Sequence, residues 1–393
     1  MLTELAHKVV MFVDVFRCLA MWLTASVLSL CVSRRPQGQK KKILVIRLDA
    51  IGDFILWLDA ARGLRSLYPA ENYEITLLGN QIWTSLAMEL PHFDRVWPLN
   101  RKKYLLNPMY CINMLRKVHK DGFDLVISPA YSREFKFCDI IARASGAAER
   151  IGSVSDDERI RRWQKQIGKH WYTRLIPARA EPLMELERNA EFLRELGAKN
   201  FRASLPELTV SSAVPQGFSA HDYFVIVPGA SSIMKQWPPG NFMELAGKIH
   251  ATTGWTGVIC GDTKEKSLGD AVAKWSDHHS ENWAGRTSLK ELSAIISGAR
   301  LVVTNDTSAV HIAAAVSTPV ACILGGGHFG RFLPYQLEAA TDRALPVAVF
   351  SMMDCYGCSW THCTHASLNH TARCISSITV QQVWDAISDK LGK

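Results

Sequence analysis

Three short segments of the chain combine residue types that could bind an anion and move a proton. The first is Arg47–Asp53, in which Gly52 permits a tight turn and Asp53 stands at the expected start of a helix. A carboxylate at a helix start stays ionised and can accept a proton from a hydroxyl group, so Asp53 is a candidate general base. The simpler interpretation is that Asp53 only caps the helix, which contributes about 1 kcal/mol.

The second segment, Pro228–Pro238, suits a phosphate group. Gly229 and Ser231 are small and leave backbone N–H groups accessible, and Lys235 is the strong cation of the segment. We therefore predict that Gly229, Ser231 and Lys235 bind a phosphorylated ligand. The alternative is that Lys235 is an ordinary lysine in a surface loop.

The third segment opens a helix with Asp306, Thr307 and Ser308, and His311 follows one turn later. The first N–H groups of a helix have no partner within it and carry partial positive charge, so they bind anions. We expect these four residues to form an anion site. The alternative is plain capping by Asp306 or Thr307, with His311 a half-buried histidine whose hydrogen bonds are satisfied.

These segments need a scaffold that brings strand ends together. Apolar, β-branched runs alternate with helical patterns, which predicts parallel sheets. The runs lie at 43–48, 74–79, 124–128, 223–228, 255–261, 301–304 and 319–324. The stretch 206–222, which contains Pro215 and Gly217, is expected to link a first lobe at 41–205 to a second lobe at 223–393. The fold class is therefore α/β, with two lobes whose strand ends face each other across a cleft.

Helix ends are also predicted by the sequence. Ser288 and Glu291 have the spacing of a capping box, which opens a helix with apolar residues at helical period. We further expect helices over 180–199, ending at Gly197, and over 380–391.

Four segments, in this order and spacing, resemble glycosyltransferase family nine, the heptosyltransferase family. They are RLDAIGD at 47–53, PGASSIMKQWP at 228–238, NWAGRTSLKELSAII at 282–296 and VVTNDTSAVHIAAAVSTPV at 302–320. The resemblance covers residues 41–390. It implies a GT-B fold, with two Rossmann-like lobes and an active site between them. It also implies that a sugar passes from a nucleotide donor, typically ADP-heptose, to the inner core of lipopolysaccharide, with inversion and without a metal or other catalytic cofactor.

The resemblance also implies roles for individual residues. The family's proposed catalytic base falls on Asp53, and its donor-phosphate lysine falls on Lys235. Its donor-binding segment falls on 306–311, where Ser308 replaces the usual glycine. Two other functions are compatible with the motifs: a glycolipid-binding or assembly protein without turnover, and another GT-B nucleotide-sugar enzyme such as an epimerase. The presence of Asp53, Lys235 and His311 together favours the transferase.

Composition and charge limit the kinds of partner that the protein is expected to bind. The 393 residues are 48% hydrophobic and 21% charged, which excludes a disordered chain and a disulfide-stapled mini-protein. Of the net charge of +8, residues 1–210 carry +9 (32 basic against 23 acidic side chains) and residues 211–393 carry −1 (13 against 14). A basic first half favours an anionic partner, so we expect a nucleotide-sugar donor and a lipid-linked saccharide acceptor. No zinc-finger or aromatic RNA-binding signature occurs, so no nucleic-acid partner is expected.

The N-terminal segment 1–40 is expected to associate with a membrane. Residues 9–32 are apolar apart from a thin polar stripe, and the basic residues Arg34, Arg35 and Lys40 follow. Three interpretations are open: an amphipathic anchor lying in the bilayer surface, a true span, and a helix packed on its own domain. The first two place the protein at the cytoplasmic face of the inner membrane, as a peripheral or singly anchored protein.

Four cysteines gather near the C-terminus, at Cys355, Cys358, Cys363 and Cys374. Thiolates this close in sequence suggest a structural Zn²⁺ ion, whose closed four-ligand shell would exclude a catalytic role. The alternatives are reduced cysteines in a packed loop, an oxidised pair, and an iron–sulfur centre.

Overall fold

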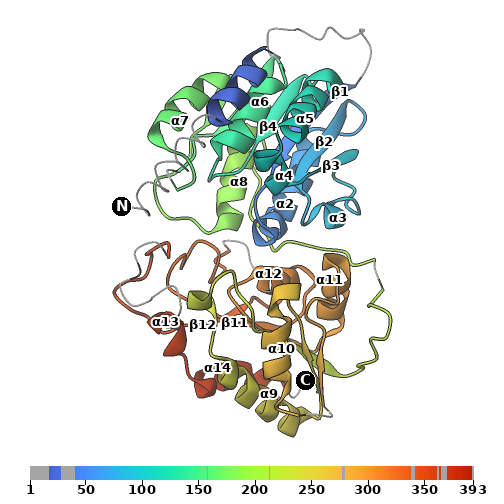
Figure 1. Cartoon of the computed structure of the whole chain (residues 1–393), viewed down its shortest axis with the longest axis vertical. Helices are drawn as coiled ribbons and strands as arrows, with labels where there is room; N and C mark the ends of the chain where they lie inside the picture. Colours follow the sequence, from blue (N-terminus) through green and yellow to red (C-terminus); the bar gives the residue numbers. More distant parts are fainter. Residues whose placement is uncertain are drawn as a thin grey trace. The chain divides into compact units, whose positions relative to one another are not determined.

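The computed structural model describes residues 17–27 and 40–391, apart from 157, 212, 277–278, 338–340, 361–362 and 364–369. The chain divides into two compact units, shown in Figure 1. The first unit contains the described residues up to 50, 60–180 and 188–201, and the second contains 51–59, 181–187 and 202 onward. Residues 51–59, which include Asp53, therefore belong by their contacts to the second unit.

A parallel sheet forms the centre of the first unit, with six strands among the described residues. Its order, β3-β2-β1-β4-β5-β6, reverses between β1 and β4, which is the doubly wound arrangement. The strands are β1 (Lys41–Arg47), β2 (Tyr73–Asn80), β3 (Arg95–Leu99), β4 (Leu125–Ser128), β5 (Glu149–Ser153) and β6 (Arg174–Ile176). β1, β2 and β4 confirm the runs predicted at 43–48, 74–79 and 124–128.

Helices connect these strands and cover the sheet. They are α2 (Ile51–Leu67), α3 (Thr84–Ala87), α4 (Arg101–Leu106), α5 (Pro108–Asp121), α6 (Ile140–Ala144), α7 (Arg162–Gly168) and α8 (Glu185–Leu196). A π-helical turn, η1 (Phe135–Asp139), precedes α6, and a 3₁₀ turn, η2 (Lys169–Trp171), follows α7. The helix predicted over 180–199 starts later, at Glu185, and ends as expected before Gly197.

The second unit repeats the same plan. Its described part holds a parallel sheet of six strands in the order β12-β11-β10-β7-β8-β9, which again reverses between its first and fourth strands in chain order. The strands are β7 (Tyr223–Val227), β8 (Thr256–Ile259), β9 (Ser280–Asn282), β10 (Leu301–Asn305), β11 (Val320–Ile323) and β12 (Val347–Val349). All four strands predicted for this half are confirmed, whereas β9 and β12 were not predicted.

The helices of the second unit follow the expected caps. They are α9 (Pro239–Thr253), α10 (Lys266–Ala273), α11 (Leu289–Gly298), α12 (Ser308–Ala315), α13 (Arg373–Ser376) and α14 (Val380–Ile387), with 3₁₀ turns η3 (Ile233–Lys235), η4 (Thr263–Glu265) and η5 (Ser388–Lys390). The capping box at Ser288 and Glu291 is confirmed, because each side chain accepts a hydrogen bond from the other residue's backbone N–H.

Residues 17–27 form a helix that packs on the first unit. Its inner side chains Cys18, Met21 and Ala25 are buried in the same core as β1 and α6, and Gln164 of α7 donates a 3.8 Å hydrogen bond to Cys18 Sγ. The described part of the expected membrane-associating segment thus packs on its own unit, which is the third of the interpretations above. The rest of that segment, 1–16 and 28–39 with Arg34 and Arg35, lies outside the described residues. Within the described ranges, none of the helices has the length and apolar character needed to cross a bilayer.

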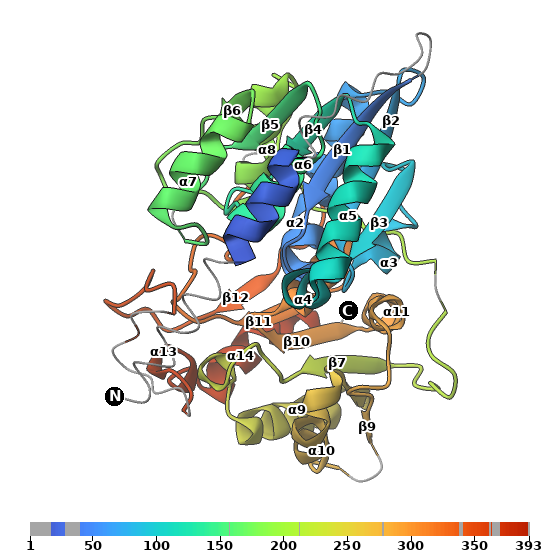
Figure 2. The same ribbon diagram turned by 45° about the horizontal axis from the view of Figure 1, so that its top comes forward.

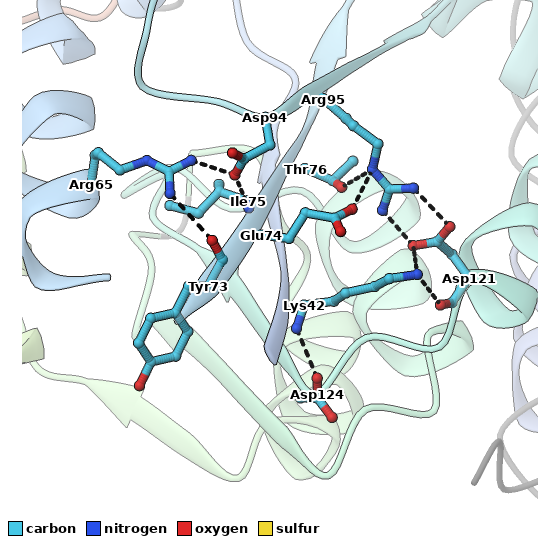
Figure 3. Close-up of polar contacts among 10 residues, drawn as sticks. All are labelled: Lys42, Arg65, Tyr73, Glu74, Ile75, Thr76, Asp94, Arg95, Asp121 and Asp124. Atoms are coloured by element: carbon cyan, nitrogen blue, oxygen red, sulfur yellow. Dashed lines mark hydrogen bonds and ion pairs between the residues drawn. The ribbon is translucent and has the colours of Figure 1, made fainter. Parts of the chain in front are cut away.

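A charged network fastens one edge of the first sheet to the end of α5 (Figure 3). The guanidinium of Arg95 donates to both carboxylate oxygens of Asp121, at 3.1 and 2.6 Å, and also contacts Glu74 at 2.8 Å and Thr76 at 3.0 Å. Lys42 contributes a second cation, 3.4 Å from Asp121. Burial raises the pKa of Asp121, but the hydrogen bond and charge of Arg95 outweigh it and hold that pKa below its ordinary value.

We expect the Asp121→Asn variant to lose about 1–2 kcal/mol of unfolding free energy at pH 7, because it removes charge-assisted hydrogen bonds. The folded pKa lies below the unfolded value of about 3.9, so this contribution is complete above that value and is lost as the pH falls through the folded pKa. Denaturant unfolding at pH 7 and pH 3 should therefore show a smaller difference from wild type at pH 3.

The matched control is Asp222→Asn. Its partner Arg300 lies 2.8 Å away, but both side chains are more than half exposed, so this variant should cost less than about 0.5 kcal/mol. If the two variants lost the same amount of unfolding free energy, the stabilising role of the Asp121 network would be contradicted.

Candidate functional site

Two neighbouring strands of the second sheet end in predicted binding segments. β7 and β10 pair where the strand order reverses, so the loops that follow them lie together. Asn305, the last residue of β10, is completely buried. Its Nδ2 donates to the carbonyls of Pro228 (2.7 Å) and Gly229 (3.2 Å), and its Oδ1 accepts from the backbone N–H of Trp237 (3.0 Å). One amide therefore holds both ends of the loop that carries Lys235, a role that was not predicted.

Lys235 closes the 3₁₀ turn within this loop and is half-buried. Its Nζ lies 5.0 Å from the centroid of the Trp360 ring, a distance suited to a cation–π interaction. Burial lowers the pKa of Lys235, and the carboxylate of Asp306 opposes that lowering. The structure thus brings Lys235 and Asp306 together from the two strand ends.

The first turn of α12 combines a cap with a half-buried carboxylate. Thr307 is the N-cap, because its side chain accepts a hydrogen bond from the N–H of Ala309 at 3.3 Å. Asp306 precedes the cap, and burial raises its pKa while Lys235 lowers it. The predicted cap is therefore Thr307 rather than Asp306, and the first-turn N–H groups around Ser308 lie beside the lysine loop.

His311 lies one turn into α12 and is buried. Its Nδ1 is 2.8 Å from the hydroxyl of Tyr335, and the two rings are stacked with an interplanar angle of 6°. Burial lowers the pKa of His311 to about 4, although the carboxylate of Asp53 acts in the opposite direction. His311 is therefore neutral at pH 7, and it satisfies a hydrogen bond as the simpler interpretation held.

The start of α2 approaches this histidine closely. A methyl group at Gly52 would come within 3.0 Å of His311 Cδ2 and 3.8 Å of Ser308 Cα. The start of α2 therefore packs tightly against His311, and this approach places Asp53 near the first turn of α12. Asp53 itself is half-buried at the first turn of α2.

The remaining predicted donor residues differ in exposure. Gly229 is buried and faces the carboxylate of Glu265, which occupies the space that a side chain at 229 would need. Ser231 is exposed on the same loop. Glu265 follows β8, the strand next to β7, and burial raises its pKa. Glu265 was not predicted from the sequence, although an acidic residue after the second strand of such a sheet is a signal for nucleotide ribose recognition.

Trp360 is the second residue that the sequence analysis missed. Its indole is seated on the glycine-rich loop after β11, because a methyl group at Gly325 would come within 2.5 Å of the ring and one at Gly327 would overlap it. The backbone N–H of Ser359 donates to the carbonyl of Gly327 at 2.8 Å. These glycines therefore hold the ring that faces Lys235.

The cysteine-rich stretch 355–374 carries Trp360. Cys374 is buried and accepts a 3.5 Å hydrogen bond from the N–H of Gly326, whereas Cys355, Cys358 and Cys363 are half-buried. Among the described residues, no three or more His, Cys, Asp or Glu side chains are arranged to hold a metal ion. The structure does not show the zinc site, which remains a prediction from the sequence.

The first unit contains a pocket of about 550 Å³ between α4, η1 and the start of α7. Its charged lining consists of four basic and two acidic side chains: Arg101, Lys136, Arg159, Arg161, Glu134 and Glu158. Aromatic side chains of η1 complete the wall, and π-helical turns are frequent at functional sites. The lining has a net positive charge, which suits an anionic ligand with an apolar or sugar-ring face.

Arg101 connects this pocket to the turn that follows β1. Its guanidinium donates to both carboxylate oxygens of Glu134, at 3.0 and 2.8 Å, and to the carbonyl of Leu48 at 2.5 Å. The guanidinium carbon lies 4.1 Å from the centroid of the Phe137 ring. Arg101 therefore fixes the backbone just after β1 to the wall of this pocket.

Comparison with known proteins identifies the family. Residues 146–343, half of the chain, match the family model "Glycosyltransferase family 9 (heptosyltransferase)". The chain belongs to glycosyltransferase family 9. This confirms the resemblance carried by the four motifs, and glycosyl transfer is the activity of the family.

Individual relatives of this glycosyltransferase agree. Lipopolysaccharide heptosyltransferase 3 of Escherichia coli is 24% identical over 293 residues, which cover 70% of this chain and 80% of the relative. A family 9 glycosyltransferase structure from Veillonella parvula superposes with a TM-score of 0.70 over 91% of this chain and 99% of its own, at 17% identity. The structure of E. coli ADP-heptose lipopolysaccharide heptosyltransferase II superposes with a TM-score of 0.65 over 89% of this chain and 98% of its own, at 19% sequence identity. The expected GT-B fold with two Rossmann-like lobes is confirmed.

We expect His311 to make the stability of this glycosyltransferase fall as the pH decreases. Its folded pKa of about 4 is below the unfolded value of about 6.5, so between these values the unfolded chain binds a proton that the folded chain does not. His311→Gln should therefore show a flatter dependence of unfolding free energy on pH between 7 and 4.5.

The control is His221→Gln, at an exposed position outside the site. In this variant the unfolding free energy should change with pH as steeply as in wild type. If His311→Gln also kept the wild-type slope, His311 would be taking up its proton in the folded protein.

Proposed function

We propose that this glycosyltransferase transfers heptose from ADP-heptose to a lipopolysaccharide-core or related glycolipid acceptor, with inversion and without a metal ion. The observation that supports it best is the meeting of Lys235 with the first turn of α12 at the switch point of the second sheet. The choice of sugar and nucleotide follows from the similar proteins, a lipopolysaccharide heptosyltransferase and an ADP-heptose heptosyltransferase.

The donor diphosphate binds between Lys235 and the first-turn N–H groups at Thr307 and Ser308. Negative charge builds on this diphosphate as the sugar leaves it, and a half-buried cation with free helix N–H groups stabilises that charge better than water does. Lys235 and these N–H groups thereby supply the charge that a divalent cation would otherwise supply. Glu265 accepts hydrogen bonds from the ribose hydroxyls.

Asp53 acts as the general base. The acceptor hydroxyl oxygen attacks C1 of heptose from the face opposite the diphosphate, its proton passes to the Asp53 carboxylate, and ADP leaves with the electron pair of the broken C1–O bond. The neutral, buried His311 beside the start of α2 positions this carboxylate without pairing with it as an ion.

The acceptor saccharide binds in the 550 Å³ pocket of the first unit. Phosphate or carboxylate groups of the acceptor pair with Arg159 and Arg161, while Arg101 is held by Glu134 and Leu48 as part of the wall. A lipid-linked acceptor places the enzyme at the cytoplasmic face of the inner membrane.

We expect Asp53→Asn to lower kcat by about 10²–10⁴-fold with little change in the KM for ADP-heptose, because only proton transfer is lost. Lys235→Ala should raise the donor KM and lower kcat together. Initial rates of ADP release in the presence of EDTA, with a delipidated acceptor, measure both effects.

Lys248→Ala is the matched control, because Lys248 also lies over a tryptophan, 5.3 Å from the Trp384 ring, but on α9 away from the site. It should retain wild-type rates. Near-normal turnover in Asp53→Asn would refute the base, and activity lost in EDTA and restored by Mg²⁺ would refute metal independence.

For the acceptor pocket, we expect the Arg159→Ala/Arg161→Ala double variant to raise the acceptor KM about tenfold, close to 1.4 kcal/mol for two partly exposed charge contacts. The donor KM should stay unchanged. The control is Lys199→Ala, in a separate hollow of about 610 Å³ near the end of α2. Equal acceptor KM values in all three proteins would show that the acceptor binds elsewhere.

A further inference from the structure

The helix at 17–27 carries large apolar side chains on its outer side as well as on its inner side. Its inner side chains are buried in the first unit's core, as described above. Beside the exposed Arg17, its outer side carries four large apolar side chains, of which between 37% and 63% is exposed: Leu19, Trp22, Leu23 and Val27. A helix on the surface of a globular protein ordinarily presents polar side chains outward. The outer side of this helix is therefore more apolar than an ordinary solvent-exposed helix surface.

The neighbouring helix α7 also exposes apolar side chains. Gln164 of α7 contacts Cys18, and on the outer side of α7 Trp163 and Ile167 are 38% and 40% exposed. Figures 1 and 2 both place helix 17–27 between α5 and α7. We call the six outward residues of helix 17–27 and α7 the apolar face. Several large apolar side chains exposed on two neighbouring helices are typical of a binding surface for a protein or a membrane.

Helix 17–27, the segment from α4 to α5, and α7 carry almost only positive charges. Residues 17–27, 101–121 and 162–168 together hold nine Lys and Arg side chains and one acidic side chain, Asp121. That carboxylate is already paired with Arg95 and Lys42. A second copy of the chain would bring like charges together, whereas a bilayer rich in anionic lipid offers opposite charge and an apolar interior.

We propose that the apolar face docks on the surface of an anionic lipid bilayer. Trp22 and Trp163 sit at the headgroup level, where indole rings are favoured, and the leucines enter the acyl boundary. Because the inner side of helix 17–27 is fixed in the core, the helix is a rigid part of the first unit and sets its orientation on the membrane. Docking would bring the enzyme to a lipid-linked acceptor in the same bilayer, and in that respect the proposal rests on the proposed function.

The acceptor pocket lies at the edge of the apolar face. Gln164 lines the pocket and also contacts Cys18 in the first turn of helix 17–27. Docking therefore brings the mouth of the pocket to the bilayer surface, where the saccharide headgroup of a glycolipid emerges. The basic side chains Arg159 and Arg161 then meet the saccharide while its lipid remains in the membrane.

The test is flotation of the full-length protein with vesicles of phosphatidylethanolamine containing one third phosphatidylglycerol. Trp22→Glu/Leu23→Glu should lower vesicle affinity at least tenfold. Ile82→Glu/Met88→Glu should bind as wild type, since it places two acids at exposed apolar positions beside α3, outside the apolar face. Thermal unfolding checks that each protein is folded. Deleting the helix is unsuitable, because that would uncover the buried α6 residues.

Transfer to a soluble, delipidated acceptor separates this proposal from the proposed function. The two double variants should retain wild-type rates in that assay, and wild-type binding should weaken at high salt. Vesicle binding that depends on the apolar face would support docking even if no heptose transfer were found. If both variants floated with vesicles as well as wild type does, the docking proposal would be wrong. It would also be wrong if the protein formed a dimer that Trp22→Glu/Leu23→Glu dissociated while vesicle flotation stayed the same.

Discussion

A strand that ends inside a parallel sheet leaves its last carbonyl groups buried, and each of them needs a hydrogen-bond donor. In the second unit the amide of Asn305 supplies donors to Pro228 and Gly229 and fixes the loop that carries Lys235. In the first unit Arg101 supplies one to Leu48. An unpaired buried group costs about 1–3 kcal/mol, so these turns are held firmly. The shapes of both binding segments follow from this requirement.

Helix α12 joins the two halves of the proposed chemistry. Asp306, just before its N-cap, lies near Lys235, and one turn into the helix His311 lies near the start of α2 and Asp53. The same short helix therefore relates the position of the leaving group to that of the base. Partial burial strengthens the attraction between Lys235 and Asp306, since water screens their charges less than it would at the surface.

The sequence predicts the parts of the fold that local physics determines. The central strands β1, β7 and β10 are buried on both faces and so appear as apolar runs, whereas β9 is a half-buried edge strand of three polar residues without such a run. The candidate site was predictable where strand-end motifs mark it. Asn305 and Trp360 were missed because they act across space: the Asn305–Gly229 hydrogen bond joins residues 76 positions apart.

The helix at 17–27 is synthesised early but packed late. Its contact with Gln164 joins residues 146 positions apart, and at roughly 5–20 residues per second the ribosome takes roughly 7–30 s to make that stretch. During this interval both apolar sides of the helix are uncovered. Two processes therefore compete in the growing chain: packing of this helix on the first sheet and partitioning of the helix into a nearby bilayer. The rate of translation would then set how many molecules mature on the membrane and how many reach it afterwards.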